Sequence, residues 1–206
     1  VVFCSGVSYK WILGVLAVLF PLGAVFVYML QYEMIPFLRG YQATRILAWI
    51  NPKEYSAAYW QQENSIMAIG SGQLWGKGLN NTEIASVKNG NFLSEEQTDF
   101  IFAIIGEEMG FVGAMIVIAL FLLLVYECLM MAYRAKDLSG RLICTGMATL
   151  LAFQSFANIA VATAIFPNTG LPLPFVSYGV SSLLSLYIGI GVVLNVGLQR
   201  RYSNEW

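Results

Sequence analysis

The stretch that decides the fold is residues 142–199, LICTGMATLLAFQSFANIAVATAIFPNTGLPLPFVSYGVSSLLSLYIGIGVVLNVGLQ, which contains no charged residue. A membrane-spanning helix needs about 20 predominantly apolar residues, so this stretch is too long for one span. Turn-forming residues interrupt it near its middle: Pro167, Asn168, Gly170, Pro172 and Pro174. Because proline and glycine break helices, the stretch is predicted to form two spanning helices joined by a non-helical turn.

The rest of the 206-residue chain has equally uneven charge spacing. Hydrophobic residues make up 58% and charged residues 11%, whereas ordinary soluble domains carry roughly 25% charged residues. No charge lies between Lys10 and Glu33 or between Glu108 and Glu127, and each gap can hold a span. The predicted fold is an all-α, polytopic transmembrane helix bundle with about four full spans and a truncated one. The full spans are expected at roughly Trp11–Leu30, Ile101–Val125, Leu142–Ile165 and Val176–Leu198.

Lysine and arginine in the short loops predict the orientation, because positively charged loops stay on the cytoplasmic side. The flanking positive charges are Lys10, Arg134, Lys136, Arg141, Arg200 and Arg201. Residues 31–100 are then predicted to be a large extracytoplasmic loop with interfacial elements, and residues 166–175 also lie outside. Val1–Gly6 has the character of a truncated span. Residues 1–206 are therefore predicted to be a single membrane domain, the C-terminal half of a larger bundle.

The composition also excludes several classes of function. Histidine is absent, which excludes Ser-His and Cys-His catalysis and any histidine-ligated metal within this chain. The net charge of −1 provides no basic field for nucleic acid. Cys4, Cys128 and Cys144 lie in or beside apolar runs without a CxxC spacing, so they are predicted to be buried apolar residues.

Within the outer loop, Ser65–Gly78 reads SIMAIGSGQLWGKG. This segment is too short to span the membrane and too apolar for a free linker, which favours an interfacial or re-entrant element. Its glycines allow two interpretations. They permit close approach of the backbone to a lipid-linked or phosphorylated ligand, with Lys77 as the counter-charge, or they form a tight turn that folds the segment back onto the bundle.

A second segment, Ser94–Ile101, reads SEEQTDFI and leads into a predicted span. Ser94 and Gln97 have the spacing of a capping box, and the nearby carboxylates suit the positive end of a helix dipole. On a continuous helix, Asp99 and Glu107 would share one face. An ionisable residue at the membrane boundary is a functional candidate, but complementation of the helix dipole explains Asp99 equally well.

Three blocks of sequence together resemble the shape, elongation, division and sporulation (RodA/FtsW) family. The blocks are GSGQLWGKG at 70–78, TDFIFAIIGEEMGFVG at 98–113 and GLPLPFVSYG at 170–179. Tyr41–Ile46, followed by Asn51 and Pro52, is a weaker point of similarity. Residues 171–175 lean toward the elongation branch, and Val180 departs from the second glycine that family members usually carry there.

The resemblance implies a peptidoglycan glycosyltransferase that polymerises lipid II at the outer face of the bacterial cytoplasmic membrane, as a multi-pass protein working with a class B penicillin-binding protein, a transpeptidase. The family's essential aspartate maps onto Asp99, which would act as general base. The expected substrate-binding residues are Arg45, Lys77, Glu107 and Ser177. A divalent cation such as Mg²⁺ or Mn²⁺, or the side chains of Lys77 and Arg45, would neutralise the pyrophosphate, although no cage of oxygen ligands specifies a metal. The alternatives are a lipid II flippase or transporter, which would use discontinuous helices and intramembrane charges, and a non-catalytic membrane scaffold for a transpeptidase.

Overall fold

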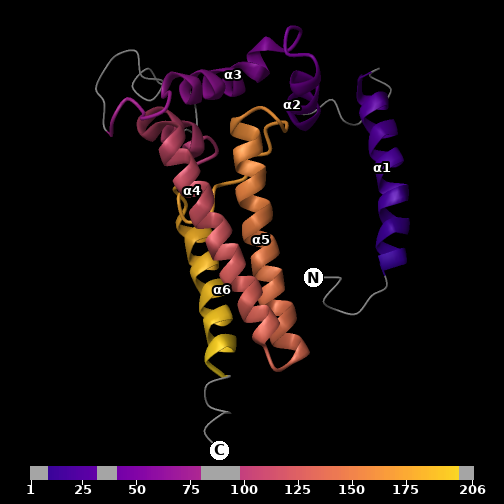
Figure 1. The fold of residues 1–206 in the computed structure, drawn as a ribbon. Coiled ribbons are helices and arrows are strands. Elements are labelled where there is room, and N and C mark those ends of the chain that lie inside the picture. The colour runs from indigo at the N-terminus through magenta and orange to yellow at the C-terminus, as the bar shows by residue number, and fades with distance from the viewer. Residues whose placement is uncertain (1–8, 32–40, 80–97, 200–206) are drawn as a thin grey trace, which may run out of the picture. The chain divides into compact units, whose positions relative to one another are not determined.

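The computed structural model describes residues 9–31, 41–79 and 98–199 (Figure 1). These residues form helices, turns and loops, and no strand occurs among them. The predicted all-α fold is therefore confirmed. The chain divides into two compact units, Val2–Trp60 and Gln61–Trp206.

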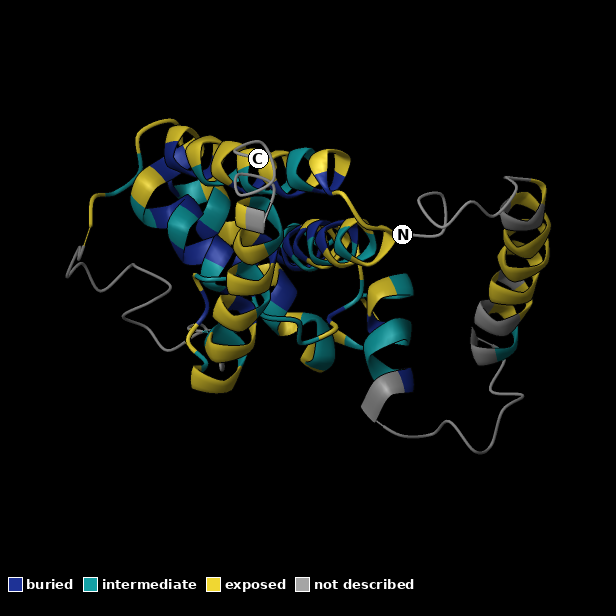
Figure 2. Ribbon diagram, turned by 90° about the horizontal axis from the view of Figure 1, so that it is seen from below, coloured by how far each residue is buried: buried dark blue, intermediate teal, exposed yellow. Residues whose placement is uncertain are grey.

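The N-terminal unit contains α1 (Tyr9–Gln31) and α2 (Tyr41–Ile50). The predicted first span, Trp11–Leu30, lies within α1, which has Pro21 inside it. Apolar side chains between Leu13 and Gly23 are exposed (Figure 2), which suits an environment of lipid. α3 (Ser56–Ser71) begins in this unit and ends in the C-terminal one.

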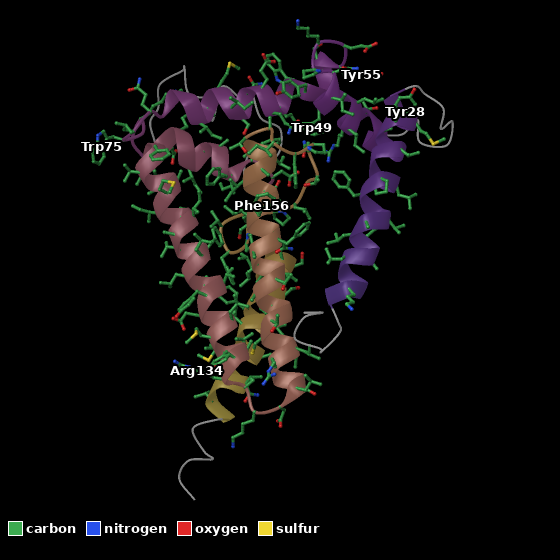
Figure 3. All side chains as sticks on the ribbon, turned by 45° about the vertical axis from the view of Figure 1, so that its right-hand side comes forward. Tyr28, Trp49, Tyr55, Trp75, Arg134 and Phe156 are labelled. Atoms are coloured by element: carbon green, nitrogen blue, oxygen red, sulfur yellow. The ribbon has the colours of Figure 1, made fainter. Side chains whose placement is uncertain are left out.

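The C-terminal unit is built on α4 (Ile101–Arg134), α5 (Leu138–Ala162) and α6 (Val180–Gln199). Among the described residues, these three helices are long and apolar enough to cross a membrane, so the chain is a multi-pass membrane protein. The short connection between α4 and α5 makes them antiparallel neighbours, and α6 packs beside both (Figures 1 and 3). The last three predicted spans are thus confirmed as helices.

Small buried residues form the contact between these helices. One core cluster joins Cys128, Ala132, Cys144, Ala148, Leu151, Leu186 and Val193. Small side chains let membrane helices approach closely and pack by van der Waals contact. Cys128 and Cys144 are free and buried in this contact, as predicted, and Cys4 lies outside the described residues.

α4 differs from the prediction of one span over Ile101–Val125. Gly110 has φ 66° and ψ −166°, so a short helical segment over residues 101–109 meets a longer one that continues to Arg134. A shared helix face for Asp99 and Glu107 requires a helix that includes Asp99, but α4 begins only at Ile101. Asp99 lies in a turn over residues 98–100, and Phe100 is the N-cap. The prediction that both carboxylates extend from one continuous helix is therefore wrong.

Between α5 and α6, residues 163–179 are non-helical. The predicted break at Pro172 and Pro174 is confirmed. The loop is also packed into the protein, because Leu173, Pro174 and Ser177 are buried. Buried irregular backbone is tolerated where the surrounding protein satisfies its polar groups.

Candidate active site

The turn that carries Asp99 is anchored by its neighbour in the sequence. Phe100 is 1% exposed and packs in a small core with Ala68, Ala103 and Val161. Asp99 itself is half-buried. The apolar anchor therefore fixes the turn while the adjacent carboxylate stays near the surface of the unit.

Two polar side chains hold the backbone of this turn. The amide nitrogen Nδ2 of Asn158 donates to the Asp99 carbonyl at 2.8 Å. The hydroxyl of Ser177 donates to the Thr98 carbonyl at 2.5 Å. Asn158 comes from α5 and Ser177 from the loop before α6, so the turn is bound to two segments that follow it far along the chain.

The C-terminal end of α5 is covered by α3. The last carbonyls of a helix lack partners within it, and here side chains supply them. Gln62 Nε2 donates to the carbonyls of Val161 at 3.2 Å and Phe166 at 2.7 Å, and Ser65 Oγ donates to the Ala162 carbonyl at 2.7 Å. These bonds fix the later part of α3 across the end of the bundle (Figure 1).

The glycine-rich loop after α3 supplies hydrogen-bond partners to the backbone at the break in α4. Backbone N–H groups of Phe111 and Val112 donate to the carbonyls of Gln73 and Leu74, at 2.8 and 3.2 Å. In the other direction, the N–H groups of Lys77 and Gly78 donate to the carbonyls of Glu107 and Glu108, at 2.9 and 3.0 Å. A helix break exposes unpaired donors and acceptors, and residues 73–78 satisfy both kinds.

The glycines are needed for this close approach. A Cβ atom at Gly72 would collide with the Gly106 carbonyl, and one at Gly76 would collide with the Glu108 carbonyl. Gly110 would meet the backbone of Leu74 and Gly76. The tight-turn interpretation of these glycines therefore accounts for the observed geometry.

Lys77 and Glu107 form an ion pair between the loop and α4. The Lys77 Nζ atom lies 2.8 Å from Glu107 Oε1, and the side chains are 23% and 2% exposed, respectively. A carboxylate this deeply buried requires a charged or hydrogen-bonded partner. The pair thus joins the glycine-rich loop to α4 through their side chains as well as their backbones.

Comparison with known proteins identifies the family. The model of the FtsW/RodA/SpoVE family, described as a cell cycle protein, matches residues 1–202. The chain belongs to this family. It is 36% identical over 200 residues to a probable peptidoglycan glycosyltransferase FtsW of Geobacter metallireducens, covering 97% of this chain and 50% of that protein. It is 38% identical over 208 residues to the peptidoglycan glycosyltransferase MrdB of Escherichia coli, covering 100% and 53%.

Two solved structures have a similar fold. A chain from "Structural coordination of polymerization and crosslinking by a peptidoglycan synthase complex" gives a TM-score of 0.65 at 30% identity, over 91% of this chain and 49% of that one. A mutant of the Thermus thermophilus rod shape determining protein RodA gives 0.50 at 31% identity, over 77% and 49%. The chain spans about half the length of the relatives it matches.

Within this FtsW/RodA/SpoVE chain, the structure gathers most of the predicted site residues at one end of the C-terminal unit. Asp99, Lys77, Glu107 and Ser177 all lie there, whereas Arg45 lies on α2 in the N-terminal unit. Figure 3 shows Trp75 near the bend in α4 and Arg134 at the far end of its longer segment. The capping-box residues, Ser94 and Gln97, lie outside the described residues.

Residues that hold the site had only a weak signal in the sequence. Asn158 and Ser177 are polar residues within the uncharged run 142–199, a pattern that fits cavity lining and hydrogen bonding between helices equally well. The structure shows hydrogen bonding by both. The contacts of Gln62 and Ser65 with α5 were not predicted.

The described residues do not form a resident metal site. No three histidine, cysteine, aspartate or glutamate side chains in ranges 9–31, 41–79 and 98–199 come together as ligands. Glu107 is already paired with Lys77.

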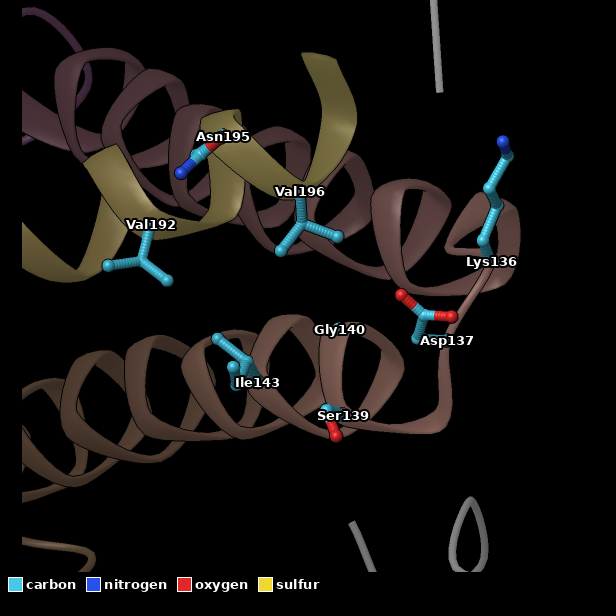
Figure 4. A pocket seen from close by; sticks show the side chains of 8 residues that line it. All are labelled: Lys136, Asp137, Ser139, Gly140, Ile143, Val192, Asn195 and Val196. Carbon is cyan, nitrogen blue, oxygen red and sulfur yellow. The ribbon is translucent and has the colours of Figure 1, made fainter. Parts of the chain in front are cut away.

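A cavity of about 270 Å³ lies at the opposite end of the bundle, between the start of α5 and the end of α6 (Figure 4). Its lining residues are Lys136, Asp137, Ser139, Gly140, Ile143, Val192, Asn195 and Val196. None of the predicted catalytic or substrate-binding residues is among them. The end that carries Asp99 is thus the candidate active site.

Proposed function

We propose that the full-length protein polymerises lipid II into peptidoglycan glycan strands at the outer face of the bacterial cytoplasmic membrane, with Asp99 as general base. The names of its relatives support this activity. The observation that carries the residue assignment is the fixed turn around Asp99. Asn158 and Ser177 hold consecutive carbonyls of that turn while the carboxylate stays half-buried.

The chemistry requires one positioned base. A sugar hydroxyl of the acceptor loses its proton to the Asp99 carboxylate as its oxygen attacks the anomeric carbon of the donor. The bond from that carbon to the lipid pyrophosphate breaks, and the bonding electrons leave with the pyrophosphate. Because this leaving group departs as a stable anion, the reaction does not need the second carboxylic acid that a glycoside hydrolase uses.

The remaining site residues would support substrate binding in different ways. Lys77 and Arg45, or a divalent cation such as Mg²⁺ or Mn²⁺, would neutralise the pyrophosphate. Glu107 would orient the Lys77 ammonium through their ion pair. Ser177 would act through its hydrogen bond to Thr98, since its buried hydroxyl already has a protein partner.

A class B penicillin-binding protein is the proposed partner. A glycan polymerase makes strands that a transpeptidase must crosslink, and one structural neighbour is described as coordinating polymerization with crosslinking. Co-purification of the full-length protein with its transpeptidase tests this part of the proposal. Failure to co-purify from membranes that contain both proteins would contradict it.

Asp99→Asn in the full-length protein tests the catalytic assignment. The change keeps the size of the side chain and removes its basicity, so turnover of lipid II should fall by about 10²–10⁴-fold. Expression and transpeptidase binding should stay near normal. Glu95→Gln and Glu96→Gln are matched controls near the same helix start, and they should cost far less.

Two outcomes would contradict the assignment. Equal losses in all three variants would make Asp99 one member of an acidic cap. Full polymerisation by Asp99→Asn would exclude it as the base and move attention to Glu107 and Glu108. A protein that shows no polymerisation but moves lipid II across the membrane would instead support the flippase alternative.

A further inference from the structure

We infer that Asn158 is a positioning residue for Asp99, acting with Ser177 to bind the 98–100 turn to the loop between α5 and α6. The inference rests on the proposed function, because it names what holds the proposed base in place. Asn158 touches no reacting atom in this assignment. Its effect passes through the backbone of Asp99.

The amide of Asn158 has its orientation fixed by its partners. Nδ2 donates to the carbonyls of Asp99 and Leu171, both at 2.8 Å. Since both partners are acceptors, only the NH₂ group can serve them, and both of its N–H donors are used. Asn158 is 1% exposed and lies within a long helix, so the donor is held rigidly.

The oxygen atom of the Asn158 amide makes no comparable contribution. Among the described residues, Asn158 Oδ1 has no hydrogen-bond partner, and neither does Ser155 Oγ one turn earlier on α5. A buried acceptor without a partner costs free energy. Leucine at position 158 would avoid that cost but could not join the turn to the loop. The two donated bonds are therefore what asparagine supplies here.

Ser177 provides a second connection between the same two segments. Its hydroxyl donates to the Thr98 carbonyl and accepts from the Leu173 N–H at 2.8 Å. Consecutive residues of the turn, Thr98 and Asp99, are thus linked through side chains to Leu173 and Leu171. With two links, the turn cannot pivot about either one, which fixes the direction in which Asp99 leaves the backbone.

A small displacement of a catalytic group has a large effect on rate. A misplacement of about 1 Å can lower the rate roughly 10²-fold, and Asn158 makes no contact with substrate in this assignment. Loss of the Asn158 donors should therefore lower kcat and leave KM nearly unchanged. A role in substrate binding would instead raise KM, and a role in folding alone would lower the amount of active protein with kcat and KM unchanged.

Asn158→Leu in the full-length protein, assayed with lipid II, is the direct test. We expect kcat to fall at least tenfold with KM within about twofold of the parent. Ser155→Ala is the matched control, since it removes a buried polar group from the same helix without removing a described hydrogen bond. It should leave kcat unchanged. Parent-like kcat in Asn158→Leu, or a raised KM with kcat intact, overturns the inference.

A second pair of variants keeps the inference testable if Asn158→Leu fails to fold. Ser177→Ala should lower kcat, and Ser177→Thr, which restores the hydroxyl, should recover most of it. Amide hydrogen exchange at residues 98–100 should be faster in Ser177→Ala than in the parent and slow again in Ser177→Thr. Equal kcat values in the Ala and Thr variants, or unchanged exchange in Ser177→Ala, contradict the connection.

Failure of the inference can be separated from failure of the proposed function. If Asp99→Asn is inactive and Asn158→Leu has parent-like kcat, Asp99 remains the proposed base but does not need Asn158. If Asp99→Asn is fully active, the proposed function of Asp99 fails whatever Asn158→Leu does. Both variants are purified by the same procedure and assayed side by side.

Discussion

At the scale of single residues, the Lys77–Glu107 ion pair gives the first structural prediction. Removing one partner of a buried pair leaves an uncompensated charge, which costs about 3–5 kcal/mol. Lys77 is 23% exposed and Glu107 is 2% exposed. Because Lys77 is only partly buried, Lys77→Met should lower the free energy of unfolding by about 3 kcal/mol, the lower end of this range. Thermal unfolding of the purified protein in detergent measures this as a lower Tm.

The control for this prediction removes both charges. Lys77→Met combined with Glu107→Gln leaves no unpaired ion, so the double variant should be more stable than Lys77→Met alone. The two effects should therefore be strongly non-additive, as expected for residues in direct contact. If the loss of stability in the double variant equals the sum of the losses in Lys77→Met and Glu107→Gln alone, the pair is not coupled as the structure shows.

The sequence predicts several residues of the site but not the contacts between them. Asp99, Lys77 and Glu107 stood out because charges are rare beside apolar spans. Their arrangement did not, because the Lys77–Glu107 contact joins positions 30 residues apart and depends on how the loop docks. Asn158 had no distinguishing spacing at all, since its partners are backbone carbonyls that carry no sequence signal.

At the scale of elements, the docking of the glycine-rich loop into the α4 break predicts which glycines tolerate a methyl group. Gly76 has φ 78°, and a Cβ there would meet the Glu108 backbone. Gly76→Ala should therefore destabilise the protein by more than the roughly 1–2 kcal/mol that a left-handed conformation costs a non-glycine residue. Gly70→Ala meets nothing within 4 Å and replaces a helical glycine, so its Tm should equal or exceed the parent value.

Gly78→Ala separates the two contributions. Gly78 has φ 92°, but a Cβ there has open space, so this variant carries the backbone cost without the collision. Its Tm should lie between those of Gly70→Ala and Gly76→Ala. A loss in Gly78→Ala as large as that in Gly76→Ala would mean that backbone conformation, and not close packing of the loop against α4, sets the requirement for glycine.

The elements themselves followed from hydrophobicity wherever the chain meets lipid. α5 and α6 matched their predicted spans closely because long uncharged runs and a proline-rich break leave few alternatives. The break at Gly110 could not be predicted in the same way. The sequence around it is apolar apart from Glu107 and Glu108, and the donors and acceptors that stabilise the break come from residues 73–78.

At the scale of the whole molecule, the antiparallel arrangement of α4 and α5 places a cluster of positive charges and the candidate active site at opposite ends of the C-terminal unit. Exposed Arg134, Lys136 and Arg141 lie around the short α4–α5 connection. Asp99 directly precedes α4, and the start of α4 and the end of α3 lie at the opposite end of the bundle (Figure 1). The distribution of positive charge sets the orientation of a membrane protein, so the Asp99 end is predicted to be extracytoplasmic, where a lipid-linked sugar would be polymerised.

Cysteine labelling of the full-length protein tests this orientation. Ser139 is exposed at the start of α5, and Thr169 is exposed in the loop that follows its other end. Asn81 lies in the predicted outer loop, outside the described residues. In a background with Cys4, Cys128, Cys144 and any other native cysteines replaced by alanine, Thr169→Cys and Asn81→Cys should react with a membrane-impermeant maleimide in intact cells. Ser139→Cys should react only after the inner face is exposed. The reverse pattern would place Asp99 on the cytoplasmic side, away from an outer-face polymerisation reaction, and would contradict both the topology and the proposed function together.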